Sequence, residues 1–398
     1  THNSGNDSIA SLSIDAGNSL AILGGSLSIS GLTKVLGTLS ASSNQMLHLG
    51  TNSEINQLNI GDSFTFSSGS ALIRQLQAQG LNVQGGSLTL GSTTTDASSL
   101  NGGALTVSGG SLILGGGNVD VGTANITAPG QLLYQGGQLT GLSSMSNTGT
   151  LSFGNTTITY PVFNTGTINL SGGVTFNRLF TNQGGTLSMA GTNTFLAGLT
   201  QDAGVLTLLN GTIVGDVNLN GGFLGGSGTI QGALNVGSAT VAPGFSPGSL
   251  TINGDLNLSA ASSLLFEIGG DQAGVTYDQL VVNGNALLAG QLTTVNYGTY
   301  TPQAGIAYDV MRFNSSSGQF ANVSSQNGLS ANLLSSGMQF TLPGVPASMA
   351  SAPPVVLASN SVITSMQNVM LEEDGGLVVG VSSPQPSPIQ SAQEDKKS

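Results

Sequence analysis

The fold is decided by the stretch Gly109-Gly110-Ser111-Leu112-Ile113-Leu114 and by its copies along the chain. Each copy places glycines, or an Asn and a Gly, before a short run in which apolar and polar residues alternate. The other clear copies are Gly24-Gly25-Ser26-Leu27-Ser28-Ile29, Gly85-Gly86-Ser87-Leu88-Thr89-Leu90, Gly102-Gly103-Ala104-Leu105-Thr106-Val107, Asn147-Thr148-Gly149-Thr150-Leu151-Ser152-Phe153, Asn164-Thr165-Gly166-Thr167-Ile168-Asn169-Leu170 and Asn182-Gln183-Gly184-Gly185-Thr186-Leu187-Ser188-Met189. The steps from Leu88 to Leu105, Leu151 to Ile168, Ile168 to Leu187 and Leu187 to Leu206 are 17, 17, 19 and 19 residues. A near-constant step indicates stacked repeats.

Within each copy the period of two predicts a half-buried β-strand. The Gly and Asn residues between strands are expected at corners that require a positive φ. A unit this short cannot bury its own apolar face, so we expect the repeats to stack as coils of a β-solenoid, roughly twelve of them in residues 1–235. A uniform cross-β polymer is the alternative, and the irregular residues 41–82 argue against it. The residues expected to point inward and stack are Leu105, Leu112, Leu151, Ile168 and Leu187.

Charged side chains are scarce, since the 398 residues hold 6 basic and 18 acidic ones and carry a net charge of −12. Stacked coils give a reason, because like charges one strand apart repel, whereas hydroxyl and amide side chains can bond between coils. The negative charge argues against nucleic acid or an anionic membrane as a partner, because both bind clustered Lys and Arg. The chain has no Cys, which excludes disulfides, and no apolar run reaches the roughly 18 residues of a membrane-spanning helix.

The pattern changes twice after the repeats. Residues 236–342 contain two Pro-bearing corners in Ala242-Pro243-Gly244-Phe245-Ser246-Pro247-Gly248 and longer strands, and we expect them to form the terminal segment and a β-rich cap. Residues 343–398 hold seven of the 12 prolines, and we expect a disordered, flexible tail there. Within that tail, apolar residues at helical spacing predict one short helix over residues 361–371.

The run from Pro243 to Leu256, together with Leu265-Phe266-Glu267-Ile268-Gly269 and Tyr277-Asp278-Gln279-Leu280-Val281-Val282-Asn283-Gly284, resembles the terminal β-helix segment of bacterial autotransporter passengers and filamentous-haemagglutinin-like exoproteins. The resemblance implies a right-handed parallel β-helix at, or released from, a Gram-negative cell surface, commonly serving adhesion or biofilm attachment. An autotransporter continues into a membrane barrel, and the residues after Leu342 lack such strands. If the carboxyl end is the natural one, the chain looks more like a protein secreted by a separate outer-membrane partner. Its first residues lack both Met and a signal pattern, so we expect a processed or excised chain.

Enzymes with β-helical folds need paired carboxylates, or acidic Ca²⁺ ligands with a basic residue. The acidic residues of the rod are scattered singly, as at Asp120, Asp202 and Asp216, and isolated corner Asp residues usually form turns. Asp202 and Asp216 could still meet on neighbouring coils. The two histidines, His2 and His48, have no second ligand type in their surrounding sequence, so neither a transition-metal site nor a Ser-His-Asp set is expected.

The densest acidic group before the tail consists of Asp255, Glu267, Asp271 and Asp278. Hard cations such as Ca²⁺ take several carboxylate and carbonyl oxygens, which makes this group a calcium candidate. The Gly-rich nonapeptide of known calcium-binding repeats is absent, and Glu267 alternates with Phe266 and Ile268 in a strand. Structural or solvated roles are therefore favoured, and no metal or cofactor is expected.

These observations predict a secreted, non-enzymatic surface protein acting in adhesion, biofilm formation or matrix attachment. Its expected partners are a host or environmental surface, a glycan or a matrix component, with self-association as a further expectation. A carbohydrate-active β-helix, of the lyase or glycosidase kind, is the alternative. The third reading is a purely structural stalk or fibre subunit.

Overall fold

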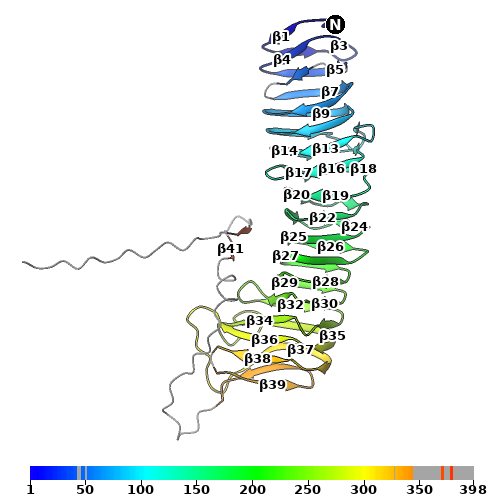
Figure 1. Ribbon diagram of the computed structural model, residues 1–398. Helices are drawn as coiled ribbons and strands as arrows, with labels where there is room; N and C mark the ends of the chain where they lie inside the picture. The colour runs from blue at the N-terminus through cyan, green and yellow to red at the C-terminus, as the bar shows by residue number, and fades with distance from the viewer. Residues whose placement is uncertain (43–45, 50–51, 327, 344–368, 372–376, 380–398) are drawn as a thin grey trace, which may run out of the picture. The chain divides into compact units, whose positions relative to one another are not determined.

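The computed structural model describes residues 1–42, 46–49, 52–326, 328–343, 369–371 and 377–379. The chain divides into two units, Thr1–Gly344 and Val345–Ser398. Every regular element in the described residues is a β-strand, and parallel strands stack coil upon coil through the first unit (Figure 1). The predicted all-β solenoid is thereby confirmed.

Each coil sends strands into three columns, and within a column strands pair in parallel with strands of neighbouring coils. The first column follows the Leu-x-Leu repeats. It runs through β2 (Leu12–Ile14), β5 (Thr33–Ala41), β7 (Ser53–Ile60), β9 (Ser70–Gln77), β11 (Ser87–Leu90), β14 (Ser111–Leu114), β17 (Gln131–Tyr134), β20 (Thr150–Phe153), β23 (Thr167–Leu170), β25 (Phe180–Met189), β27 (Leu199–Val214), β29 (Phe223–Gln231), β31 (Thr240–Pro243), β34 (Ser263–Ile268), β36 (Gln291–Asn296) and β38 (Asn322–Ser325). Twelve of these strands, β2 to β29, begin before residue 236, which agrees with the predicted number of coils.

Several long strands turn a corner, so each takes part in more than one column: β5, β7 and β9 join the first and third, β25, β27 and β29 also bridge columns, and β35 (Gln279–Leu288) and β37 (Ala307–Gly318) join the third and second. The second column contains β1 (Asn6–Ile9), β4 (Ser26–Ile29) and β6 (Met46–His48), then β8 (Ser63–Phe66), β10 (Gly80–Val83), β13 (Ala104–Val107), β16 (Thr123–Ile126), β19 (Met145–Asn147), β22 (Val162–Asn164), β28 (Val217–Leu219), β30 (Leu234–Val236), β33 (Leu256–Leu258) and β35. The third column contains β3 (Ser19–Ile22), β12 (Ala97–Ser99), β15 (Asn118–Asp120), β18 (Gln138–Thr140), β21 (Thr157–Ile158), β24 (Thr175–Phe176), β26 (Thr192–Phe195), β32 (Ser249–Ile252) and β37.

One predicted step was wrong. Leu88 pairs with Leu112 in the first column, whereas Leu105 pairs with Leu81 in the second. The 17 residues from Leu88 to Leu105 therefore join two columns, and a coil takes 24 residues at this point. The other three steps are true coil lengths, because Leu151, Ile168, Leu187 and Leu206 are consecutive partners.

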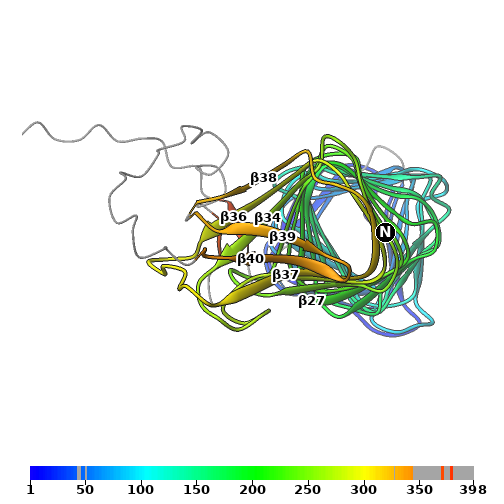
Figure 2. The same ribbon diagram turned by 90° about the horizontal axis from the view of Figure 1, so that it is seen from below.

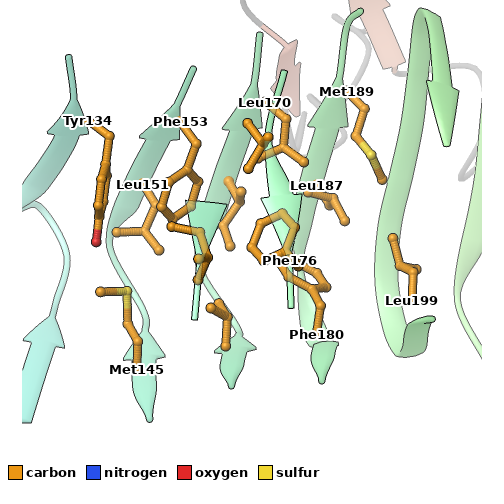
Figure 3. Close-up of a cluster of buried hydrophobic side chains, with 14 of the residues drawn as sticks. Tyr134, Met145, Leu151, Phe153, Leu170, Phe176, Phe180, Leu187, Met189 and Leu199 are labelled. Carbon is orange, nitrogen blue, oxygen red and sulfur yellow. The ribbon is translucent and has the colours of Figure 1, made fainter. Parts of the chain in front are cut away.

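The inward face has the predicted register. Leu105, Leu112, Leu151, Ile168 and Leu187 are all fully buried. Larger side chains fill the interior beside them, including Tyr134, Phe153, Phe176 and Phe180 (Figure 3). Their rings pack edge-to-face or tilted, with centroids 4.6 to 5.9 Å apart, and such contacts add to the burial of apolar area.

The glycine corners also stack as expected. Gly86 and Gly110 have φ angles of 73° and 65°, which L-residues with a side chain rarely adopt. A Cβ on Gly110 would lie 2.3 Å from the carbonyl oxygen of Gly86, and one on Gly86 would lie 2.4 Å from that of Gly69. Both the conformation and the close approach of successive coils therefore require glycine.

Parallel coils continue through residues 240–325, with a longer coil from Leu250 to its partner Leu280. The stack then ends in an antiparallel sheet made by β37, β40 (Gly337–Thr341) and β39 (Ser330–Leu334), with β40 in the middle (Figure 2). Met338 and Phe340 of β40 are buried against the core, as a cap requires. In the second unit, β41 (Val369–Leu371) pairs with β42 (Leu377–Val379). Of the helix predicted over residues 361–371, the last three residues form β41, and residues 361–368 lie outside the described residues.

Candidate binding surface

Two outward faces of neighbouring coils carry regular rows of uncharged polar side chains. On the second column, Asn218, Asn235 and Asn257 are the middle residues of β28, β30 and β33, and their strand neighbours are buried. The Asn235 amide donates to the Asn218 oxygen at 2.8 Å, and the Asn257 amide donates to the Asn235 oxygen at 2.8 Å. These three residues form what we call the outer amide ladder.

On the third column, four threonines follow one another on successive coils. Thr192 pairs with Thr212, Thr212 with Thr229, and Thr229 with Thr251. Their neighbours Asn193, Ile213, Ile230 and Ile252 are buried, so the alternation points the threonines outward. Thr192 is exposed and the other three are half-buried. We call this row the threonine column.

The outer amide ladder keeps hydrogen-bonding capacity for a ligand. A primary amide has two N–H donors and an oxygen that accepts twice. Within the ladder, Asn235 uses one donor and one acceptor position. The remaining groups are held at the inter-strand spacing of about 4.8 Å, and the threonine hydroxyls repeat at the same interval.

Carboxylates at the corners of these coils bind groups on the next coil rather than each other. Asp216 accepts a hydrogen bond from the Ala233 N–H at 2.8 Å, and Asp255 accepts one from the Asn285 N–H at 2.8 Å. Asp202 accepts one from the Asn220 amide at 2.8 Å. Asp202 and Asp216 therefore have different partners, and Asp216 and Asp255 hold the next coil in place.

A second set of asparagines lies inside the molecule, contrary to the predicted corner role. Asn147, Asn164 and Asn182 occupy strand positions, are fully buried and do not have positive φ angles. Each donates to the next side chain, at 2.7, 2.9 and 3.1 Å, and the last acceptor is the fully buried Gln201. We call these four residues the inner amide ladder. The strand period of two, counted from the inward Met145, could have identified it.

The four acidic residues of the calcium candidate are not brought together. No three or more His, Cys, Asp or Glu side chains group around a common point in the described part of the chain. Asp271 is exposed, and Asp255 serves the corner described above. Only Glu267 and Asp278 interact, through the Glu267 N–H, which donates to Asp278 Oδ2 at 2.7 Å.

The buried carboxyl group of Asp278 binds the backbone of the Pro-Gly corner. The Gly248 N–H donates to its Oδ1 at 2.8 Å, and a Cβ on Gly244 would lie 2.4 Å from the same oxygen. Burial raises the pKa of Asp278 to about 8, and the two backbone N–H groups act against this shift. Burial also raises the pKa of Glu267, while a side-chain hydrogen bond with Ser246 lowers it.

These shifts predict a pH dependence of stability. Between the ordinary value of 3.8 and about 8, the folded protein holds a proton on Asp278 that the unfolded chain releases. The free energy of unfolding should therefore fall as the pH rises through this window and level off above it. The Asp278→Asn variant should lose part of this slope in urea unfolding measured across that range. Asp271→Asn, at an exposed position, is the matched control and should keep the slope, and an identical slope in Asp278→Asn would contradict the assignment.

The histidines do not take part in these surfaces. His2 contacts Asp7 through Nδ1 at 3.1 Å and the Gly5 carbonyl through Nε2 at 3.2 Å, and His48 lies on β6. Within the described ranges, none of the elements is a helix of the length and apolarity needed to cross a membrane. No protein-family model and no curated protein matches the chain.

Proposed function

We propose that this chain is a secreted, non-enzymatic surface protein of a Gram-negative bacterium, acting in adhesion, biofilm or matrix attachment. The observation that supports the proposal is the pair of registered, uncharged rows, the outer amide ladder and the threonine column. The sequence resemblance of residues 240–290 to autotransporter and haemagglutinin-like exoproteins supports the cell-surface location and an outer-membrane secretion partner.

The proposed ligand is a glycan or another matrix polymer. Each hydroxyl or amide gives a weak contact on its own, because water competes for the same hydrogen bonds. A ligand that repeats along its length can bind several side chains of these rows at once. Because the contacts are linked, the overall affinity is much higher than that of any single contact. Since the rows carry no charge, binding should depend little on salt concentration.

Asn235→Asp tests this surface. The substitution keeps the side-chain shape but removes both amide donors and adds a negative charge in the centre of the outer amide ladder. On a glycan array probed with the purified chain, we expect a loss of binding of about tenfold, or about 1.4 kcal/mol. Asn169→Asp, at an exposed position of β23 on the first column, is the matched control and should bind as the wild type does.

The same preparations should be assayed for reducing sugar and unsaturated uronate. Binding without turnover supports the adhesin. Turnover that Glu267→Gln abolishes would instead support the carbohydrate-active alternative, for which Glu267, a half-buried carboxyl group whose pKa is raised by burial, is the candidate acid. If neither binding nor turnover is found, the structural stalk is the better description.

A further inference from the structure

The last strands of the solenoid carry no charge, and the nearest charged side chains of the cap sheet, Asp309 and Arg312 on β37, pair with each other at 3.4 Å. Although the chain has a net charge of −12, residues 313–342 contain no Asp, Glu, Lys or Arg. This segment includes β38, β39 and β40. Two copies of a strongly negative protein can therefore approach each other at this end without direct repulsion between charged side chains.

The same end presents an open strand edge. In the described part of the chain, β39 pairs with β40 alone. All five residues of β39 are exposed, and Leu333 and Leu334 retain 48% and 45% of their accessible surface. An exposed edge strand is usually protected by charges, by Pro or by a bulge. The sequence Ser330-Ala331-Asn332-Leu333-Leu334 contains neither charge nor Pro.

The two faces of β39 are assigned by its partners on β40. Ala331 is opposite Phe340 and Leu333 is opposite Met338, and both partners are buried. Ala331 and Leu333 therefore lie on the core side of the sheet, at the rim of the cap. Asn332 is opposite Gln339 on the outer side.

We infer that two copies of the chain associate end to end through antiparallel pairing of their β39 strands. A two-fold axis through Asn332, perpendicular to the sheet, places Asn332 opposite its own copy, Ala331 opposite Leu333 and Ser330 opposite Leu334. The small Ala331 thus faces the larger Leu333 on the core side, twice by symmetry. The result is one continuous antiparallel sheet, with the two apolar cores meeting at their capped ends.

A second copy is the occupant that these observations favour. The edge is self-complementary under a two-fold axis, as an isologous interface must be. The edge strand β39 itself has no charge by which to recognise a differently charged protein. The inference does not depend on the adhesive function proposed above, because its test measures mass and length and not ligand binding.

The test uses the full chain in light scattering coupled to size exclusion. We expect the wild type to have twice the mass of one chain, and X-ray scattering should show a particle that is doubled in length and unchanged in width. Asn332→Lys and Asn332→Asp each place two like charges face to face at the axis, which disfavours cross-strand pairing. Each variant alone should be a monomer. Asn169→Lys, which adds the same charge at an exposed site far along the coils, should remain a dimer.

The decisive sample is an equal mixture of the Asn332→Lys and Asn332→Asp variants, because only pairing about this axis brings the two opposite charges together. The mixture should recover the double mass. A wild type that stays monomeric at its highest soluble concentration would overturn the inference. So would a dimer that persists in Asn332→Lys alone, or a mixture that remains monomeric.

Discussion

Replacing Ile168 by Asp should strongly destabilise the solenoid. Ile168 is fully buried between its partners Leu151 and Leu187. The substitution removes an apolar side chain from a packed site and buries a carboxyl group that has no hydrogen-bond partner. The first effect costs about 2–5 kcal/mol and the second adds several more. We expect a large drop in the urea midpoint and in resistance to protease.

The adjacent residue provides the control. Asn169 is exposed on the same strand, so Asn169→Asp introduces the same side chain on the opposite face. It should change the free energy of unfolding by no more than about 0.5 kcal/mol. Equal effects of the two substitutions would mean that the strand register is wrong by one residue, since a slip of one exchanges the two faces.

The sequence was sufficient to predict which residues point inward, because strand alternation is local. Leu112, Ile168 and Leu187 are recognised from their immediate neighbours, and glycines such as Gly110 mark the corners between strands. The solenoid follows, since short amphipathic strands joined by tight corners can bury their apolar faces only by stacking.

Coil length and column identity were harder to predict. Leu88 and Leu105 look equivalent in sequence, yet they lie on different columns. Between Gly85 and Leu114 each coil contributes one strand to each of the three columns, so similar repeats follow one another within a single coil. Composition alone cannot tell a strand on the next column from a strand on the next coil. Only the pairing of Leu88 with Leu112 distinguishes them.

The roles of individual polar residues also depended on tertiary neighbours. Asn164 and Asn235 are both strand residues, but Asn164 is fully buried and Asn235 faces outward. Asp278 belongs to the acidic group that the sequence makes a calcium candidate, but its carboxyl group binds the backbone of Gly248 and Glu267. In each case the role of the residue depends on a hydrogen-bond partner on another strand or corner. The number of residues between the two partners cannot be read from the repeat.

The inner amide ladder should also be sensitive to substitution. Asn164 accepts a hydrogen bond from Asn147 at 2.7 Å and donates to the Asn182 oxygen at 2.9 Å. It also donates to the carbonyl oxygens of Gly166 and Thr186. Asn164→Asp keeps the shape but replaces the donor group by an oxygen that faces three acceptors. Since a buried, unsatisfied polar group costs about 1–3 kcal/mol, and more when charged, we expect a loss of about 3–5 kcal/mol in urea unfolding.

Asn235→Asp is the matched control, because it makes the same change at the centre of the outer amide ladder, where water can replace the lost hydrogen bond. It should cost no more than about 1 kcal/mol. This difference also bears on the adhesion test. If the Asn235→Asp variant is stable but fails to bind, the substitution has removed the binding groups of the outer amide ladder and has not unfolded the protein. If Asn164→Asp were tolerated as well as Asn235→Asp, the inner amides would not be holding neighbouring coils together. Apolar stacking alone would then have to account for the stability of those coils.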